Sequence, residues 1–411
     1  MREILFLAHR IPFPPNRGDK IRSHNLLKRL VQIAPVHVAT FAEDDADMAE
    51  EVELAGLARS YRLVPRSRPL ILAGLRSLVS GRPVSLHAFY DPALAHYVGT
   101  VLRERPIGTI FIFSGQMGQY VPDDFAGRVV ADFVDCDSLK FENYAKRPRN
   151  FARRVYEREG RLLRDEEARI ATRAEVSLLI SAEEAALFSS RLTPEELAQA
   201  DVRVLRNGID SAAFDPGGCL AEPRLEDLPG PRLIFTGQMD YPPNIDAVAR
   251  AAQRVMPLIR EDCPAASFHV VGRNPTDRVK SLHGLNGTHV WGSVDDVRPW
   301  LKGADAALVP LEIGRGVQNK VLEAMAMALP TVLTSAAATG IPATDGKHFV
   351  VADSDADLAL AVRRLAADPA SARALGQDAR RFIVERFSWA SALADLPEIL
   401  GARRLAAQDA A

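Results

Sequence analysis

The stretch from Gly314 to Ser335 holds residue types that suit the binding of an anion. Gly314 and Gly316 precede an apolar pattern with helical spacing, and glycine lets backbone N–H groups approach a ligand closely. The first N–H groups of a helix have no partner inside the helix, and they lie at the positive end of its dipole. The pattern therefore indicates a loop and helix that bind phosphate.

Lys320 and Glu323 lie three residues apart in this stretch and share one face of the expected helix. An ammonium group suits a phosphate, and a carboxylate suits sugar hydroxyl groups. Together they match a nucleoside diphosphate that carries a sugar. The alternative is an ordinary surface ion pair on an α/β helix.

Apolar side chains must position this pair. Those at helical spacing are Val317, Val321, Ala324, Met325 and Ala328. Pro330 cannot continue the helix, so the helix is expected to end before it. Residues Thr331 to Thr334 then form a short buried strand.

Length and composition bound the class of protein. A chain of 411 residues exceeds what one core usually serves, so two domains are expected. The 51 basic and 53 acidic residues give a net charge of −2, which argues against a nucleic-acid-binding protein. Cys136, Cys219 and Cys263 lie far apart and form neither a disulfide framework nor a zinc motif.

The three scattered cysteines also suit a protein of the reducing cytoplasm. The apolar run at the start of the chain is too short for a signal peptide. No run approaches the ~18 to 20 apolar residues that span a bilayer. We expect a soluble or peripheral cytoplasmic protein.

Strand-like and helix-like segments alternate along both halves of the chain, which predicts parallel, doubly wound α/β sheets. Expected strands of the first half are Ile4–Ala8, Val36–Phe41, Thr109–Phe113, Arg128–Phe133 and Val176–Ile180. Expected strands of the second half are Leu233–Thr236, Ser267–Val271, His289–Trp291, Ala306–Pro310, Thr331–Thr334 and Phe349–Ala352. A turn-rich linker around Asn207 separates two Rossmann-like domains, at 1–205 and 206–385. The charged segment from Phe151 to Arg173 reads as an exposed helix with solvated charges.

Two glycines mark equivalent loops at the predicted cleft between these domains. Gly18 lies between the first strand and its helix, and Gly237 has the same position in the second domain. Asp19, Lys20 and Arg22 place charged groups beside Gly18. Val294 lies on a loop whose backbone suits hydrogen bonding to a base edge.

Residues 66–83 interleave apolar residues with arginines and contain no acidic residue. The arginines are Arg66, Arg68, Arg76 and Arg82. One interpretation is a helix that lies on an anionic membrane surface. The other is a helix packed on its own domain, with solvated arginines.

Taken together, these motifs resemble the retaining glycosyltransferases of family 4, which have the GT-B fold. The motifs that carry the resemblance are the loop at Gly18, the linker RNGIDSAAFDP, the TG at Gly237, the G-x-V-x-D from Gly292 to Asp296, KVLEAMAMALPTV from Lys320, and FSWASAL from Phe387. Within that family, PFPPNRGDKIRSHNLLKRL and GRGVQNKVLEAMA look most like the sugar transferases associated with exosortase-type exopolysaccharide systems. The resemblance also implies that a last helix, about residues 386–411, crosses back onto the first domain.

The resemblance implies roles for particular residues. Glu323 would hold the ribose hydroxyls of the donor, Val294 would contact the base, and Gly18 would touch the donor phosphate. The family's first glutamate is replaced by Arg315. Gln238 and residues 242–244 stand where the family has its diphosphate-binding arginine and lysine.

We therefore expect Arg315 and Lys320 to supply the positive charge that stabilises the departing diphosphate. The alternative is that Arg315 points into solvent. The cleft histidine of the family is also missing, since Phe113 and Val134 occupy its nearest positions. Asp135 is the first acceptor-side candidate, with Asp19 as the second.

The predicted site therefore has two groups of residues and contains no metal or resident cofactor. The catalytic group is Lys320, Arg315 and Asp135. The donor-binding group is Gly18, Gly237, Gln238, Val294, Gly316, Val317 and Glu323. The resemblance implies retaining, metal-independent transfer to a glycan or polyprenyl-linked acceptor in surface or exopolysaccharide synthesis, without the paired carboxylates of glycosidases.

Three competing interpretations stay open. The first is that Asp135-Cys136-Asp137 is a DxD metal motif, or that one of its aspartates caps a helix. A second is that the chain is a sugar-nucleotide epimerase of the same architecture, although we find no cluster of titratable groups placed for proton abstraction. The third is a non-catalytic scaffold that has kept the fold.

Overall fold

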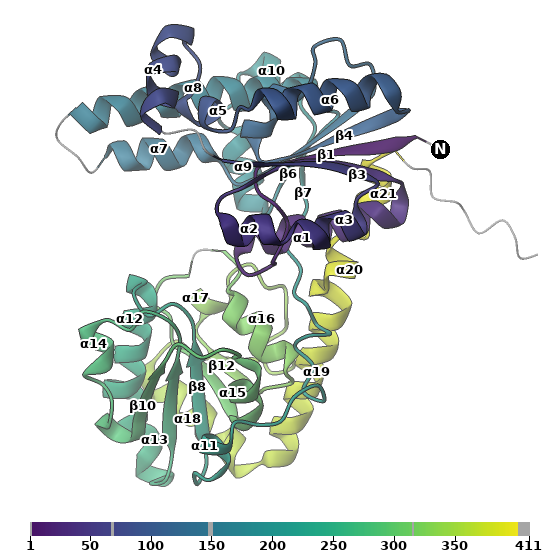
Figure 1. Cartoon of the computed structure of the whole chain (residues 1–411). Coiled ribbons are helices and arrows are strands. Elements are labelled where there is room, and N and C mark those ends of the chain that lie inside the picture. The colour runs from purple at the N-terminus through teal and green to yellow at the C-terminus, as the bar shows by residue number, and fades with distance from the viewer. Residues whose placement is uncertain (1, 67–69, 147–150, 315, 402–411) are drawn as a thin grey trace, which may run out of the picture. The chain divides into compact units, whose positions relative to one another are not determined.

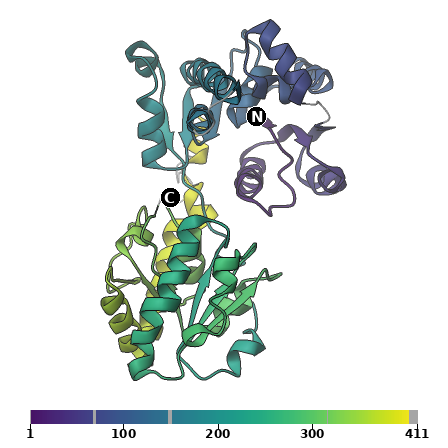
Figure 2. The same cartoon turned by 90° about the vertical axis from the view of Figure 1, so that its left-hand side faces the viewer.

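A computed structural model describes residues 2–66, 70–146, 151–314 and 316–401 (Figure 1). The chain divides into two compact units, of which unit 1 comprises residues 1–207 and 392–411, and unit 2 comprises residues 208–391. The observed division differs from the predicted one by two residues at the linker and by six near the C-terminus. Within each unit, helices cover both faces of a parallel sheet (Figures 1 and 2).

Unit 1 contains a seven-stranded parallel sheet in the order β3-β2-β1-β4-β5-β6-β7. Its strands are β1 Glu3–Ala8, β2 Val36–Ala42, β3 Ser60–Pro65, β4 Ile107–Phe113, β5 Arg128–Val134, β6 Val176–Leu179 and β7 Val202–Val204. The central strands are buried nearly throughout, as is usual for parallel strands covered on both faces. The edge strands β3 and β7 escaped the sequence analysis because they are only partly buried and each carries an arginine.

The helices of unit 1 connect these strands and lie on both sides of the sheet (Figure 1). They are α1 Gly18–Ile33, α2 Asp45–Ala49, α3 Glu51–Leu57, α4 Leu70–Ser80, α5 Val84–Ala88, α6 Pro92–Glu104, η1 Gly115–Tyr120, α7 Asp137–Ala145, α8 Phe151–Arg173, α9 Ala182–Ser189, α10 Pro194–Gln199 and α21 Leu396–Ile399. The strand order reverses between β1 and β4. In such sheets, ligands bind beyond the carboxyl ends of the strands at the reversal.

Unit 2 contains a six-stranded parallel sheet in the order β10-β9-β8-β11-β12-β13. Its strands are β8 Arg232–Thr236, β9 Ser267–Val271, β10 Thr288–Gly292, β11 Ala306–Val309, β12 Thr331–Leu333 and β13 Val350–Val351. All six strands predicted for this half are present, and their order reverses between β8 and β11. The doubly wound α/β prediction is thus confirmed for both units.

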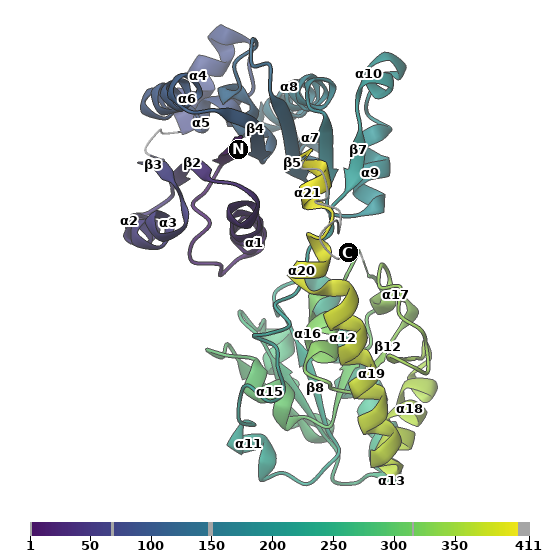
Figure 3. The ribbon, with the colours of Figure 1, turned by 90° about the vertical axis from the view of Figure 1, so that its right-hand side faces the viewer.

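The helices of unit 2 include α16, on which the predicted site depends. They are α11 Pro223–Glu226, α12 Pro242–Arg250, η2 Ala251–Val255, α13 Met256–Asp262, α14 Asp277–Lys280, η3 Leu285–Gly287, α15 Arg298–Gly303, α16 Asn319–Ala326, α17 Ser335–Ala338, α18 Asp355–Ala367 and α19 Pro369–Phe387, while α20 Trp389–Ala392 reaches the boundary. Figure 3 shows α19 lying along one side of this unit with α18 beside it. Helix α19 also packs against α16.

A close backbone approach fixes how α16 packs. A Cβ atom on Gly376 of α19 would lie 2.1 Å from the carbonyl oxygen of Ala328, just after α16. Any residue other than glycine would push the two helices apart. The position of α16 is therefore set by α19, far along the chain.

Two charged residues expected beside the cleft are buried inside unit 1 instead. Lys20 forms an ion pair with Asp47 and donates to the carbonyl oxygen of Phe13 at 2.8 Å. Arg22 donates to Asp132 at 2.9 Å, and both side chains are buried. The prediction was wrong because the helical pattern of α1 does not reveal carboxylates that other strands and helices supply.

Helix α8 also differs from the expected solvated helix. Glu159 accepts hydrogen bonds from the backbone N–H groups of Val84 and Ser85, at 2.7 and 2.8 Å. Glu167 accepts from the N–H group of Ser138 at 2.9 Å. Both glutamates are buried, so their carboxylates hold the first residues of α5 and α7 and do not face solvent.

We expect the substitution Arg22→Leu to lower the free energy of unfolding of unit 1 by about 3–5 kcal/mol, because it leaves the buried Asp132 carboxylate without its partner. Urea unfolding followed by far-UV circular dichroism measures the change. Trp291, Trp300 and Trp389 all lie in unit 2, so their fluorescence reports the other unit as an internal control.

The matched control is Lys28→Leu, an exposed position on the same helix, which should change the free energy of unfolding by less than about 1 kcal/mol. A loss below about 1 kcal/mol in Arg22→Leu would contradict the structural role of this pair.

Candidate functional site

A cavity of about 450 Å³ opens in unit 2 at the carboxyl ends of β8 and β9, against the first turn of α16. It lies beside the reversal in strand order, where ligand sites are expected. The predicted donor-binding residues that line it are Gly237, Gln238, Val294, Val317 and Glu323, together with the predicted catalytic Lys320. The structure thus brings together six predicted residues from separate segments of the chain.

Lys320 is the cationic centre of this cavity. Its ammonium group donates a hydrogen bond to the side-chain oxygen of Asn244 at 2.7 Å and lies 4.9 Å from the ring centroid of Phe235. The amide nitrogen of Asn244 donates in turn to the carbonyl oxygen of Gln238 at 2.9 Å. An amide and an aromatic ring orient the ammonium group and leave its charge unneutralised.

Burial perturbs the acid–base chemistry of Lys320 and Glu323. Burial lowers the pKa of Lys320 to about 8, although the negative charge of Glu323 opposes this shift. Burial likewise raises the pKa of Glu323 to about 7, against the effect of Lys320. Among the residues that the structure describes, none forms a hydrogen bond with the Glu323 carboxylate. Perturbed titratable groups that share a cavity are typical of functional sites.

Glycine is required in the two loops that form the floor of the cavity. Gly237 has a φ of +148°, and a Cβ atom there would lie 3.2 Å from Cε of Lys320. A Cβ atom on Gly272 would lie 1.6 Å from the carbonyl oxygen of Gly237. The loops after β8 and β9 can therefore meet only because both residues are glycine. Gly316 has a φ of +64° with open space around it, so its requirement is conformational.

Arg273 is a cavity residue that the sequence analysis missed. It follows Gly272 after β9, is exposed, and lines the same cavity as Lys320. Its guanidinium group donates to the side-chain oxygen of Gln238 at 3.3 Å. The sequence did hold a signal for this residue, because Gly272 directly follows a predicted buried strand, as Gly237 does.

Arg315, which was predicted to share the cationic role with Lys320, lies outside the described residues. Arg273 therefore supplies the second cation in the described part of the cavity. It enters the cavity from the loop after β9, whereas Lys320 enters it from α16.

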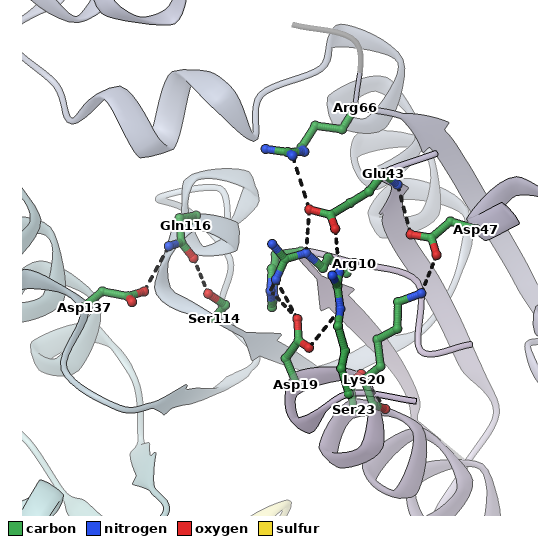
Figure 4. A network of polar contacts seen from close by, with 12 residues as sticks. Arg10, Asp19, Lys20, Ser23, Glu43, Asp47, Arg66, Ser114, Gln116 and Asp137 are labelled. Atoms are coloured by element: carbon green, nitrogen blue, oxygen red, sulfur yellow. Dashed lines mark hydrogen bonds and ion pairs between the residues drawn. The ribbon is translucent and has the colours of Figure 1, made fainter. Parts of the chain in front are cut away.

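Asp19 in unit 1 belongs to a dense ionic network (Figure 4). Its carboxylate lies 2.6 Å from Arg10, 3.3 Å from Arg17 and 3.4 Å from His9. Burial alone would raise the pKa of Asp19, but hydrogen bonds from His9 and Arg10 outweigh it and hold that pKa well below its usual range. Asp19 is thus a permanently ionised partner of arginines and a poor general base.

Glu43 is the second centre of this network. Arg10, Arg17 and Arg66 lie 2.7, 2.5 and 3.2 Å from its carboxylate (Figure 4). Arg10 and Arg17 come from the loop between β1 and α1, and Arg66 directly follows β3. Gly18 is the first residue of α1 at this edge. A Cβ atom added there would have no neighbour within 4 Å, so the structure gives no steric reason for glycine at this position.

Asp135 is also engaged by a cation. The ammonium group of Lys140 donates to Asp135 and to Asp137, both at 2.9 Å. Burial raises the pKa of Asp135, although Lys140 opposes the shift. Cys136 between them is buried, and its pKa is raised to about 11. One lysine thus occupies the space that a cation would take in the DxD interpretation.

A histidine packs against Phe113, one of the two positions considered for the cleft histidine that the resemblance implies. The ring of His9 stacks on Phe113, with centroids 5.6 Å apart and planes 18° apart. His9 directly follows β1, whereas Phe113 ends the neighbouring strand β4. Sequence position alone could not reveal this histidine, because about 100 residues separate the two strands along the chain. Val134, the other position considered, has a φ of +69°, which is strained for a β-branched residue.

Comparisons with known proteins support the fold and part of the family prediction. The family model described as Glycosyl transferases group 1 matches residues 230–368, a segment of unit 2 that contains every residue lining the cavity. Glycogen synthase of Mycobacterium tuberculosis (strain ATCC 25618 / H37Rv) is 28% identical over 200 residues, which cover 46% of this chain and 46% of that protein. This chain spans about half the length of the curated relatives it matches.

Solved structures match nearly the whole chain. HepE of Anabaena in complex with UDP has a TM-score of 0.60 at 14% identity, covering 98% of this chain and 100% of that one. Sucrose-phosphate synthase of Thermosynechococcus elongatus has a TM-score of 0.61 at 16% identity, covering 97% and 98%. WaaG, a glycosyltransferase involved in lipopolysaccharide biosynthesis, has a TM-score of 0.55 at 15% identity, covering 97% and 100%. The chain therefore has the fold of GT-B glycosyltransferase structures, as predicted.

We expect Glu323→Gln to stabilise unit 2 above pH 7. The folded-state pKa of Glu323 is about 7 against an ordinary 4.5, so the folded protein holds this proton more tightly than the unfolded chain. Wild-type stability therefore falls as pH rises from 4.5 to 7, and the glutamine variant escapes this loss. At pH 8 the variant should gain about 1–3 kcal/mol, since one pKa unit corresponds to about 1.4 kcal/mol.

The measurement is urea unfolding at pH 5 and pH 8, followed by the fluorescence of the unit 2 tryptophans. The control is Glu261→Gln, an exposed glutamate of the same unit. An equal effect of Glu323→Gln at both pH values would contradict the raised pKa.

Proposed function

We propose that this protein is a glycosyltransferase that moves a sugar from a nucleoside-diphosphate sugar to an acceptor. The observation that carries the proposal is the cavity of unit 2, in which the ammonium of Lys320 and the carboxylate of Glu323 lie one helical turn apart, and no described residue donates a hydrogen bond to that carboxylate. The match of residues 230–368 to Glycosyl transferases group 1 supports it. So do the similar folds of the Anabaena protein in complexes with UDP and with UDP-glucose.

Each group has a defined role in this proposal. Lys320 and Arg273 contact the diphosphate, with Arg315 as a further cation and the first turn of α16 contributing N–H groups. Glu323 accepts hydrogen bonds from ribose hydroxyls, and the backbone at Val294 contacts the base. As the sugar–phosphate bond breaks, negative charge grows on the diphosphate, and fixed cations beside it lower the barrier.

The proposal further holds that transfer is retaining and independent of metal. A departing phosphate oxygen would take the proton of the acceptor hydroxyl while that hydroxyl attacks the same face of the sugar. This step requires no carboxylate as base. The ion pairs of Asp19 and Asp135 agree with that, because both carboxylates already have cationic partners in unit 1.

The proposed acceptor is a glycan or a polyprenyl-linked saccharide of surface or exopolysaccharide synthesis, and the proposed location is the cytoplasm. A polyprenyl-linked acceptor lies in a membrane, so the proposal includes peripheral contact of residues 66–83 with its inner face. No described helix is both long and apolar enough to span a membrane.

We expect Lys320→Ala and Glu323→Ala each to lower the transfer rate by at least about 100-fold, the scale observed when one transition-state contact is removed. The assay follows release of nucleoside diphosphate from a panel of nucleotide sugars with a mixed glycan acceptor. Lys280→Ala, which removes an exposed lysine of the same unit, should leave the rate unchanged.

Circular dichroism must show that the variants stay folded. Turnover within about threefold of wild type in either cavity variant would contradict the site, because one lost transition-state contact costs far more. Formation of an epimerised nucleotide sugar without any acceptor would favour the epimerase alternative.

We expect Arg273→Ala to weaken UDP binding by about 10- to 100-fold, because it removes one charge-assisted contact to the diphosphate worth about 1.5–3 kcal/mol. Arg315→Ala should raise the donor KM or lower kcat. Calorimetric titration with UDP measures the first effect, with GDP and ADP in parallel.

Arg278→Ala removes an exposed arginine that pairs with Asp246 outside the cavity, and it should bind UDP like the wild type. Equal affinities of the Arg273 and Arg278 variants for every nucleotide would remove Arg273 from the donor site.

A further inference from the structure

Between residues 72 and 80, helix α4 presents its large apolar side chains to solvent and two small side chains to the protein. Ala73 and Ser77, one turn apart, are fully buried. The large apolar residues of the helix that stand outward are Leu72, Leu75, Leu78 and Val79, with exposed fractions from 52% to 92%. An amphipathic helix of a soluble domain normally has the opposite arrangement.

Polar contacts hold α4 in this orientation. The guanidinium group of Arg158, on α8, donates to the hydroxyl of Ser77 at 2.7 Å and to its carbonyl oxygen at 2.8 Å. The Ser77 hydroxyl donates to the carbonyl oxygen of Arg82 at 2.6 Å. Rotation of α4 to bury its leucines would break these contacts and leave buried polar groups without hydrogen-bond partners. The exposure of the leucines is therefore built into the packing.

Exposed arginines lie on α4, just after it, and on the part of α8 that contacts it. Arg76 and Arg82 are exposed, and Arg154 is exposed one turn before Arg158 on α8. Residues 66–83 contain no acidic residue. Arg66 is turned elsewhere, toward Glu43 and the ring of Phe89, while Arg68 lies outside the described residues. Figure 1 shows α4 at the outer margin of unit 1, near the first half of α8.

We infer that α4 is a docking surface for an anionic lipid bilayer. Leu72, Leu75, Leu78 and Val79 would enter the headgroup region, as the apolar faces of interfacial helices do, and the arginines would meet lipid phosphates. A second copy of the chain fits less well, because a two-fold contact would bring the arginine-bearing face of one copy against the same face of the other. This inference rests on the membrane contact of residues 66–83 in the proposed function and assigns that contact to the outward face of α4. Vesicle binding tests it apart from the transfer reaction.

The test uses the full chain with two kinds of vesicle, of phosphatidylcholine alone and with about 30% phosphatidylglycerol, the anionic fraction chosen to give a clear surface charge. Co-sedimentation should show binding of the wild type to the anionic vesicles. The double variant Leu75→Ser/Leu78→Ser should lower the partition coefficient at least about tenfold, since buried apolar area sets the binding strength. Val52→Ser is the matched control, since Val52 is 78% exposed on α3 of the same unit, and it should bind like the wild type.

A second double variant tests whether binding to the bilayer requires the positive charge of the arginines. Arg76→Gln/Arg82→Gln should lower binding to anionic vesicles about tenfold or more, since each arginine near such a surface contributes about 1 kcal/mol. Its binding to neutral vesicles should not change.

Three results would overturn the inference: no vesicle binding by the wild type, equal binding by the Leu75/Leu78 variant, or a dimer in solution that this variant converts to monomer. Transfer to a soluble acceptor, assayed without vesicles, separates the two proposals. Activity without vesicle binding would reject the surface alone, and vesicle binding without activity would reject the function alone.

Discussion

The hydrogen bond from the Lys320 ammonium to the side-chain oxygen of Asn244 is the contact on which the charge of the unit 2 cavity depends. A carboxylate in that place would cancel the charge, whereas an amide orients the ammonium and leaves its charge available. Burial then destabilises the charged form, as the lowered pKa of Lys320 shows. The folded protein therefore loses some stability by burying this charge, and in the proposed function a bound diphosphate would restore it.

The rest of unit 2 supplies the rigidity that this arrangement requires. Gly237 and Gly272 let two strand-ending loops touch, and Gly376 lets α19 support the end of α16. Each contact is a close approach of backbone atoms that a single methyl group would prevent. Lys320 and Glu323 thus stand on a helix whose C-terminal end packs against α19, and they face two loops that meet in close contact, as a preorganised electrostatic site demands.

The sequence carried enough information for five of the seven strands of unit 1, for all six strands of unit 2, and for the placing of Lys320 and Glu323 in one cavity. Parallel strands buried on both faces are continuous apolar runs, and the three-residue spacing of Lys320 and Glu323 sets their common face. What it could not show are partners brought together by folding. Asp132 neutralises Arg22, and Lys140 neutralises Asp135. Arg273 and Lys320 line one cavity only because β9 and β11, which precede them, lie on either side of β8. The sequence also left open which way the apolar side chains of α4 face, because their orientation depends on Arg158 of another helix.

The titration of Lys320 itself tests this account most directly. Nuclear magnetic resonance of the lysine side chains, with Lys320→Arg to assign the signal, gives its pKa in the free protein and with UDP bound. The account predicts a pKa of about 8 in the free protein and a clear rise when UDP binds, because the diphosphate stabilises the ammonium. An ordinary lysine pKa in the free protein, or a pKa that UDP leaves unchanged, would contradict it.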